Sequence, residues 1–417
     1  MRKLLPLLVL ALLGWSTTAA LAGGLSHHPV HHRRHGNVRR CQLVRAGKHH
    51  RHACRLRHHA RRHPGRPTPP SPPPPVVPLP SGTPAPPQVH CTLFASPSGS
   101  DTAGDGSIGR PFASVQQLDR SLQAGQTGCL RAGSYGSTST WHQIYANGAP
   151  SAQITITSYP GEFATVIGYL DIEASYTTFT RLRVDGSNTL YKSHPSGVNC
   201  PNNVSQSLVI AGHDDILDHI EYFQSTPALR GNGIGIGFWG DADNTIIRYS
   251  KIHDVGQCMA YDHLIYLAHG NNVQIYDNWL YNDPHGRGVQ LYPGPTNAKI
   301  FDNVVDRAGE GFVIGNLQGE TVSGNQIFHN LVTNCLGLPW QGIAGQAIHD
   351  LYLGPIGTGN AFHDNLLFGD PGGLGQVSAV QVYNNITADP RYANASANNY
   401  ALLPGSPAGG WGLWSGQ

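Results

Sequence analysis

Short runs of alternating apolar and polar residues recur along the chain from about residue 154 to 386, without helical spacing. Five of these runs are alike: "IYDNWL", "IFDNVV", "VSGNQI", "FHDNLL" and "VYNNIT". Repeats of ~20 to 30 residues built from short β-type runs are typical of a solenoid, in which each repeat forms one coil stacked on the last. The pattern therefore predicts an all-β fold, a single-stranded parallel β-helix.

One asparagine has the same place in each of the five runs, and two earlier runs, "ILDHIE" and "IIRYSK", have His219 and Ser250 there. Asparagine tolerates the left-handed turn conformation, and stacked asparagine side chains can hydrogen-bond from coil to coil. We therefore predict a structural ladder at these positions. Its asparagines are Asn278, Asn303, Asn325, Asn365 and Asn385.

A second run in each repeat supplies the interior. Aligning "GIGIGF", "LIYLAH", "GVQLYP", "GFVIGN" and "DLYLGP" gives two aliphatic columns, which strand alternation points toward the core. The first column is Ile234, Ile265, Val289, Phe312 and Leu351. The second column is Ile236, Leu267, Leu291, Ile314 and Leu353.

Both ends of such a stack need a cover, because terminal strands otherwise present open edges. Segment 111–125 starts with proline, has helical apolar spacing and ends in glycine, so it predicts a capping helix within a cap over 90–135. The turn-rich segment 386–408 breaks the repeat and predicts a closing cap. The β-helix domain is thus expected over 90–408, with coils over about 150–388 and a Gly/Trp tail over 409–417.

The first 89 residues differ from this domain. Two basic residues precede the apolar run "LLPLLVLALLGW" and an "ALA" at 20–22, which is the layout of a signal peptide over 1–22. Residues 23–66 hold 11 Arg, 1 Lys and 11 His without an acidic residue, and 67–89 are proline-rich. These compositions predict a disordered basic arm and a stiff linker, in an exported protein whose mature chain has no transmembrane segment.

Charge divides the chain in the same way. The 417 residues have a formal net charge of +2, but the arm and signal peptide hold 14 of the 27 basic residues, so 67–417 carries about −12. The arm could bind an anionic wall polymer, a membrane surface, nucleic acid or a metal, or it could be a solvated arm without a binding role. No specific nucleic-acid motif is present. The acidic body disfavours a polyanionic substrate held by charge alone. A bound divalent cation such as Ca²⁺, or a neutral glycan, avoids that conflict.

Seven cysteines fit an exported protein, and they lack the spacing of a zinc site. Sequence alone leaves their pairing open, and Cys335 is the odd one. The disulfide candidates are Cys41 with Cys54, Cys91 with Cys129, and Cys200 with Cys258.

"LFASPSGSDTAGDGSIGRPFASVQQL" followed by "CLRAGSY" resembles the opening segment of bacterial right-handed parallel β-helix proteins of the pectin lyase-like superfamily. The asparagine-bearing runs are similar to its PbH1-type repeats, and "ADPRYANASANNYALLPGSPA" is similar to its closing segment. The resemblance covers roughly 91–408 and implies a right-handed coil. It implies less about activity, since the superfamily includes uronan lyases, hydrolases, epimerases and members with no assigned role.

Side chains at equal register on successive coils become neighbours at ~4.8 Å, so two polar columns are candidates for chemistry. Strand alternation points the first column inward, where Arg287 and Glu310 would form an internal ion pair, whereas a turn at the start of each strand would rotate it into an outer groove. The first column is Asn232, His263, Arg287, Glu310 and His349. The second column is Gly235, Tyr266, Gln290, Val313 and Tyr352.

In an outer groove these residues suit β-elimination on a polysaccharide, most simply an acidic or cell-wall glycan. A uronan lyase needs a base near the sugar C5 proton, a group that neutralises the carboxylate, and an acid. Arg287 and Gln290 are the candidates for neutralisation, and Glu310 for holding a cation. The candidates for proton transfer are His263, His285 and Tyr266, and those for sugar binding are Tyr292, Tyr352 and His349.

Three alternatives stay open. A hydrolase needs two carboxylates ~5 to 9.5 Å apart, and Asp262 with Glu310 is the best pair. "DPH" at 283–285 resembles part of the Asp-Pro-His-Asp motif of mannuronan epimerases, but Gly286 replaces the final acid, and Asp283 and Pro284 are otherwise turn residues. The third alternative is a non-catalytic glycan-binding or surface protein. In each case we expect a secreted or cell-surface monomer.

Overall fold

The computed structural model describes residues 89–190, 207–238, 240–257, 262–352 and 356–416. The expected signal peptide, basic arm and proline-rich linker lie outside the described residues, as do Cys41, Cys54, Cys200 and Cys258. Residues Gln88–Gln417 form one compact unit. Within the described ranges, no helix is long and apolar enough to cross a membrane.

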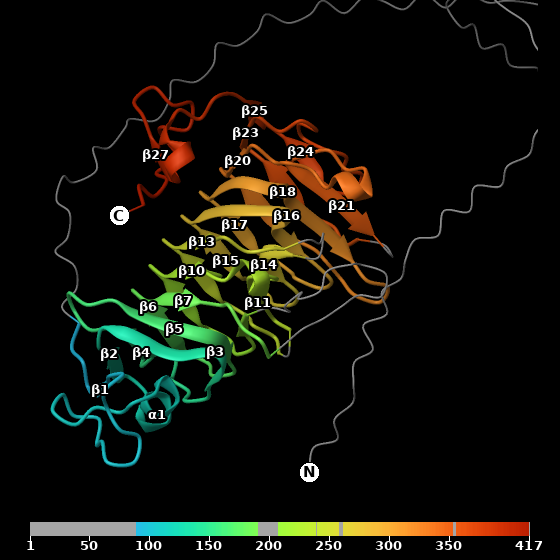
Figure 1. Ribbon diagram of the computed structural model, residues 1–417. Helices are drawn as coiled ribbons and strands as arrows, with labels where there is room; N and C mark the ends of the chain where they lie inside the picture. Colours follow the sequence, from blue (N-terminus) through green and yellow to red (C-terminus); the bar gives the residue numbers. More distant parts are fainter. Residues whose placement is uncertain (1–88, 191–206, 239, 258–261, 353–355, 417) are drawn as a thin grey trace, which may run out of the picture. The chain divides into compact units, whose positions relative to one another are not determined.

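Short parallel strands stack into two long sheets (Figure 1). The eleven-stranded sheet, called face A below, contains in spatial order β1 (Leu93–Ala95), β2 (Thr127–Leu130), β4 (Ile154–Ser158), β6 (Thr177–Thr180), β9 (Ile216–Asp218), β12 (Ile246–Arg248), β15 (Gln274–Tyr276), β17 (Lys299–Phe301), β19 (Gln326–Phe328), β22 (Ala361–His363) and β24 (Gln381–Tyr383). The second sheet has fourteen strands. They are β3 (Gly133–Ile144), β5 (Ala164–Ile172), β7 (Arg183–Asp185), β8 (Leu208–Ile210), β10 (Glu221–Phe223), β11 (Ile234–Ile236), β13 (Lys251–His253), β14 (His263–Leu267), β16 (Trp279–Leu291), β18 (Val304–Asn316), β20 (Leu331–Thr333), β21 (Ile348–Tyr352), β23 (Leu366–Phe368) and β25 (Ile386–Thr387).

The long strands of the second sheet turn a corner of the coil. The first part of β16 pairs with β13, and its last part pairs with β14. We call the β7-β10-β13 side face B and the β8-β11-β14 side face C. Each complete coil therefore has three strand segments, one on each face, which is the arrangement of a parallel β-helix.

The two aliphatic columns are confirmed as far as β18. Ile265 pairs with Val289, which pairs with Phe312, and all three side chains are fully buried. The prediction for the last coil was wrong, because Ile348 rather than Leu351 pairs with Phe312. Ile348 is fully buried and Leu351 is 40% exposed, so the core selects the apolar residue three positions earlier. Leu353 lies outside the described residues.

The asparagine ladder runs along the corner between faces A and B. The amide Nδ2 of Asn278 donates to Oδ1 of Asn303 at 2.9 Å, and Asn365 donates to Asn385 at 3.0 Å. The rung between Asn303 and Asn365 is Asn330, so the prediction of Asn325 was wrong.

Asn325 belongs to a different corner, where it donates to Asn360. The place given to His219 was also wrong, since Ile220 aligns with Ser250 and donates its N–H to the Ser250 hydroxyl. The left-handed conformation belongs to the residue before each rung, such as Asp277 with φ 55°. Spacing alone did not separate these two neighbouring positions.

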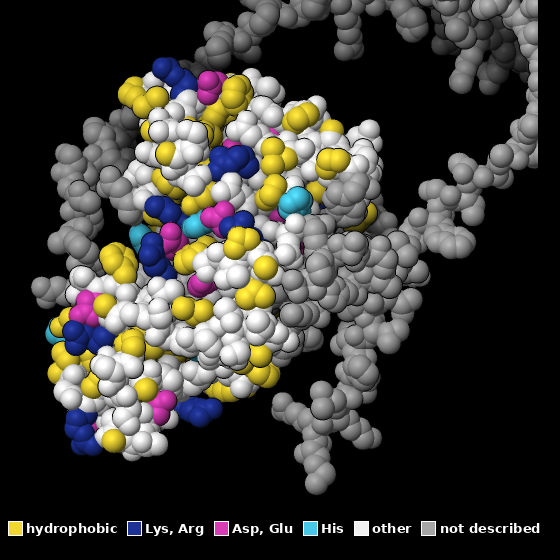
Figure 2. Space-filling model, in the orientation of Figure 1, with side chains coloured by type: hydrophobic (Ala, Val, Ile, Leu, Met, Phe, Trp, Pro, Cys, Tyr) yellow, Lys and Arg dark blue, Asp and Glu magenta, His cyan; other side chains and the backbone are white. Residues whose placement is uncertain are grey.

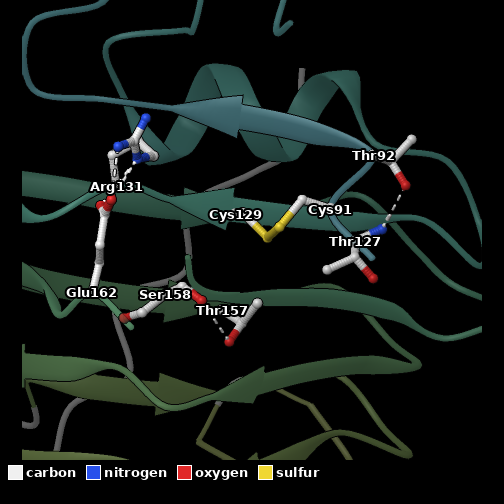
Figure 3. Close-up of a disulfide and its surroundings, with 8 residues drawn as sticks. All are labelled: Cys91, Thr92, Thr127, Cys129, Arg131, Thr157, Ser158 and Glu162. Carbon is white, nitrogen blue, oxygen red and sulfur yellow. Dashed lines mark hydrogen bonds and ion pairs between the residues drawn. A yellow bond between two sulfur atoms is a disulfide. The ribbon is translucent and has the colours of Figure 1, made fainter. Parts of the chain in front are cut away.

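The N-terminal cap contains α1 (Val115–Ser121), which is shorter than the predicted segment 111–125. The Ser114 side chain caps it by accepting a hydrogen bond from the N–H of Gln117. Figure 3 shows the predicted disulfide between Cys91, which precedes β1, and Cys129 in β2. Cys335 is a free, buried cysteine.

The closing segment contains β26 (Tyr392–Asn394) and β27 (Asn399–Leu402), which pair antiparallel. Three short 3-10 helices complete the elements: η1 (Pro227–Leu229), η2 (Pro339–Gln341) and η3 (Ala395–Ala397). Figure 1 shows the closing segment in red beside β20 and β23. It covers an apolar cluster on the outside of face B that includes Trp279, Val304 and Tyr400, and Trp411 and Trp414 of the tail pack against the same cluster.

Candidate functional site

The first polar column lies on the outside of face C, because the strand alternation breaks where β14 begins. Leu264 and Ile265 are consecutive residues, and both belong to the interior core, as does Leu267. His263 is therefore turned away from the core. It meets the side chain of Gln290, which lies between the core residues Val289 and Leu291. His263 of the first predicted column and Gln290 of the second thus meet on the outer side of the strands.

His263 is held by two amide side chains. Its Nδ1 is 2.7 Å from Oδ1 of Asn232, and its Nε2 is 2.7 Å from Oε1 of Gln290. Each partner is a side-chain amide, so both ring nitrogens of His263 are engaged and the ring orientation is fixed. The ring also lies 4.8 Å from that of Tyr266, which lies 4.8 Å from Phe238.

Arg287 and Glu310 form an ion pair one coil further along. Arg287 Nε donates to Glu310 Oε2 at 3.1 Å, and the two side chains are 5% and 0% exposed. Gln346 Nε2 donates to Oε1 of Glu310 at 2.7 Å, and His349 Nδ1 lies 3.1 Å from the same oxygen without the alignment of a good hydrogen bond. The predicted ion pair therefore forms and is buried, but on the outer side of the strands.

The pKa of the Glu310 carboxyl is set by opposing effects. Burial raises it, but the proximity of His349 and the positive charge of Arg287 outweigh burial, so the pKa lies below its usual range. Glu310 is thus a carboxylate that is already satisfied by protein donors. This arrangement does not suit the predicted role of Glu310 in holding a cation.

The largest difference between sequence and structure concerns Asp283. It was predicted to be a turn residue, but it lies within a strand. It is fully buried inside β16, and burial followed by the negative charge of Asp262 raises its pKa well above the usual range. Neither carboxylate oxygen of Asp283 has a well-aligned partner among the described residues, although the N–H groups of His285 and Gly286 lower the pKa somewhat. Burial and the neighbouring Asp262 therefore both favour the protonated form of the Asp283 carboxyl.

Two glycines make room for this acid pair, Asp262 and Asp283. A Cβ atom on Gly256 would lie 2.1 Å from Oδ1 of Asp283, and one on Gly286 would lie 2.5 Å from Oδ2. The glycine at 286, which weakened the epimerase resemblance in the sequence, has this steric role.

The remaining predicted residues are spread more widely. The His285 side chain is exposed, and only its backbone N–H approaches Asp283. Tyr292 is half-buried and lies just beyond β16. The pKa of Tyr266 is raised mainly by burial and secondly by Tyr292. Tyr352 pairs in register with Asn316, not with Val313, so it does not belong to the second column. His349 takes the register place opposite Val313.

We call the side chains of His263, Tyr266, Arg287, Gln290 and Glu310 the outer cluster. We count with it the adjoining acid pair, whose Asp283 pairs in register with the core residue Ala308. In the described part of the chain, no group of three or more His, Cys, Asp or Glu residues is placed to hold a metal. A hollow of about 390 Å³ lies beside α1 and β3, and one of about 340 Å³ lies beside β26. Neither of these two is lined by residues of the outer cluster.

A second group of charges lies on face B. Figure 2 shows basic, acidic and histidine side chains gathered over the region of β10 and β13. There Glu221 pairs with Arg183 at 2.6 Å and with His253 at 3.5 Å. Hydrogen bonding to His253 and Arg183 lowers the pKa of Glu221 to about 2 despite its partial burial. These charges are mutually satisfied and are most simply structural.

Comparison with known proteins identifies the fold. No protein-family model and no curated protein sequence matches the chain. Among solved structures, the pectate lyase Pel9A is similar with a TM-score of 0.51 at 11% identity, over 76% of this chain and 90% of that one. A rhamnogalacturonan lyase is similar with a TM-score of 0.46 at 12% identity, over 74% and 92% of the two chains.

The lacto-N-biosidase of family GH136 from Eubacterium ramulus has a TM-score of 0.44 at 14% identity, over 72% of this chain. The present chain spans 63% of that enzyme's length. The resemblance to parallel β-helix proteins of the pectin lyase-like type is thereby confirmed at the level of the fold. The class of the protein is a parallel β-helix protein with a buried polar cluster on the outside of one face.

Proposed function

We propose that this protein is an exported, right-handed β-helix protein that acts on a polysaccharide at the outer cluster of face C. The observation that carries the proposal is the break in alternation at Leu264 and Ile265, which brings His263 to the outer surface beside Tyr266 and Gln290. A purely structural strand would keep alternating and would give this position to the core. The disulfide between Cys91 and Cys129 supports an exported protein.

The reaction we favour is β-elimination on a uronan. A base removes the proton from C5, the C4–O bond breaks, a C4=C5 double bond forms, and an acid protonates the departing oxygen. His263 and Gln290 are the candidates for binding the substrate carboxylate, because Arg287 is already paired with Glu310. Tyr266, whose ring lies 4.8 Å from that of His263, is the candidate for proton transfer.

The test is a panel of uronans and neutral glycans, with product measured as absorbance at 235 nm and as new reducing ends. We expect unsaturated product from a uronan and a loss of about 10²-fold or more in turnover for His263→Ala. His269→Ala is the matched control, since that half-buried histidine lies in a turn 3.8 Å from Glu320. Equal activity in the two variants would remove His263 from the reaction.

A second candidate function is glycan binding without catalysis. It is favoured by the closed Arg287–Glu310 pair, whose side chains are almost inaccessible. Measurable glycan binding with no product in either assay would select it. New reducing ends without absorbance at 235 nm would instead indicate a hydrolase, for which the acid pair Asp262 and Asp283 would be the first residues to substitute.

A further inference from the structure

The outer surface of face C has a second group of functional side chains near its N-terminal end. Trp141 in β3 and Tyr145 just after it face outward, because His142 and Ile144 between them are buried. The neighbouring strand β5 contains Asp171, and Glu173 is the first residue after the end of this strand. Figure 1 shows β3 and β5 beside one another near α1.

The two carboxylates of this group lack a cation. Oδ2 of Asp171 accepts a hydrogen bond from Trp141 Nε1 at 3.2 Å, whereas Oδ1 is buried with no hydrogen-bond partner. Asp171 is only 3% exposed, while Glu173 is exposed and has one long contact, at 3.5 Å from the Tyr145 hydroxyl. Among the described residues, neither carboxylate forms an ion pair, unlike Glu221 and Glu310 elsewhere in the molecule. No cation among the described residues therefore balances the charge of these two carboxylates.

Two large aromatic side chains stand next to these carboxylates. Trp141 is 41% exposed and Tyr145 is 42% exposed. Such rings bind the apolar face of a sugar and attract a cation held over them. A uronate placed here would instead meet two negative charges. The combination therefore fits a sugar unit that carries an ammonium group.

We propose that Trp141, Tyr145, Asp171 and Glu173 form a binding site for a protonated amino sugar unit of a glycan. The proposal rests on the carbohydrate role proposed above, but not on catalysis. The register leads from Asp171 to Val209, Gly235 and then Tyr266, so this site and the outer cluster share one surface at a separation of roughly 14 Å. A glycan with amino sugar and acidic units would match both.

The experiment measures binding of a β-1,4-linked glucosamine tetrasaccharide to the full chain by titration calorimetry. The same titration is repeated with the N-acetylated tetrasaccharide and with tetragalacturonate. We expect the glucosamine oligomer to bind, and the other two to bind at least 10-fold more weakly. Asp171→Asn combined with Glu173→Gln should weaken glucosamine binding at least 10-fold with an unchanged circular dichroism spectrum, since both changes keep side-chain shape.

Tyr383→Ala is the matched control, because Tyr383 is 44% exposed on face A and lies far along the stack. It should leave binding unchanged, whereas Trp141→Ala should weaken it. No binding of the glucosamine oligomer, or equal binding by the double variant, overturns the site. Failure of the polysaccharide activity assay leaves this result untouched, because no turnover is measured.

The pH dependence gives a second readout. Burial, the charge of Glu173 and the hydrogen bond from Trp141 together place the pKa of Asp171 at about 6. The surrounding groups are Glu173, the Tyr145 hydroxyl with Arg120 near it, and apolar Val209 on the next strand. Binding should therefore strengthen from about pH 4.5 to 6, where the sugar amine stays protonated, and this rise should vanish in Asp171→Asn. A rise that persists in the variant would assign it to another group.

Discussion

The asparagine ladder and the outer cluster both bury polar side chains in the same coils, but they satisfy them to different degrees. Asn303 donates to the carbonyls of Ile275 and Phe301 and to Asn330, and it accepts from the backbone and side chain of Asn278. In the outer cluster, Asp283 lacks a well-aligned partner and its neighbour is another carboxylate.

The difference separates a structural device from a candidate site. A buried polar group without a partner costs about 1 to 3 kcal/mol, and a natural protein tolerates such a cost chiefly where function requires it. The ladder repeats from coil to coil, whereas the outer cluster occurs once. We therefore expect substitutions in the ladder to lower stability only, and those at the acid pair to raise stability.

The largest expected effect is at Glu310, which is the satisfied part of the outer cluster. Glu310→Ala leaves the guanidinium of Arg287 buried without its carboxylate, and we expect a loss of about 3 to 5 kcal/mol in the free energy of unfolding. Chemical denaturation followed by circular dichroism measures it, with Glu320→Ala as the control at an exposed glutamate. A loss below about 1 kcal/mol would mean that Arg287 is solvated and open to a substrate carboxylate.

A smaller loss is expected in the middle of the ladder. Asn303→Ala removes the amide oxygen that accepts from the N–H of Asn278 and the NH₂ group that donates to two carbonyls. Because these partners are left unpaired, we expect a loss of about 2 to 3 kcal/mol in the free energy of unfolding. The same denaturation experiment measures it. Asn271→Ala is the control, because Asn271 is an exposed asparagine whose side chain accepts from Asn297, and it should change stability by less than about 0.5 kcal/mol. Equal effects in the two variants would contradict a stabilising ladder.

The sequence predicted the fold from features that repeat. Two aliphatic columns and the recurring asparagine are visible without coordinates because every coil must fill the same interior and close the same corner. The errors came where two neighbouring choices fit the pattern equally. Leu351 was preferred to Ile348, and Asn325 to Asn330, because periodicity does not decide between apolar or amide residues a few positions apart.

The candidate site was harder to predict because it depends on single events. Strand alternation pointed His263 and Arg287 inward, and the two consecutive core residues Leu264 and Ile265 show that the alternation breaks in the coil of His263. The burial of Asp283 depends on space left by Gly256 and Gly286, which are distant in sequence from each other. Neither event leaves a repeat in the sequence.

The smallest expected change in the free energy of unfolding under mildly acidic conditions concerns Asp283. It is a gain in stability, whereas the two changes above are losses. Its folded-state pKa is raised by burial and by Asp262, so its contribution to stability is fully present below the ordinary aspartate pKa of ~3.9 and is lost as the pH rises toward the folded pKa. Asp283→Asn mimics the protonated acid and should therefore stabilise the protein by about 1.5 kcal/mol at pH 5, and by almost nothing near pH 3.5. Thermal unfolding between pH 3.5 and 7 measures the difference, with the exposed Asp241→Asn as the control. A stabilisation that does not grow with pH would mean that Asp283 is an ordinary carboxylate, and the contrast between the ladder and the outer cluster would then disappear.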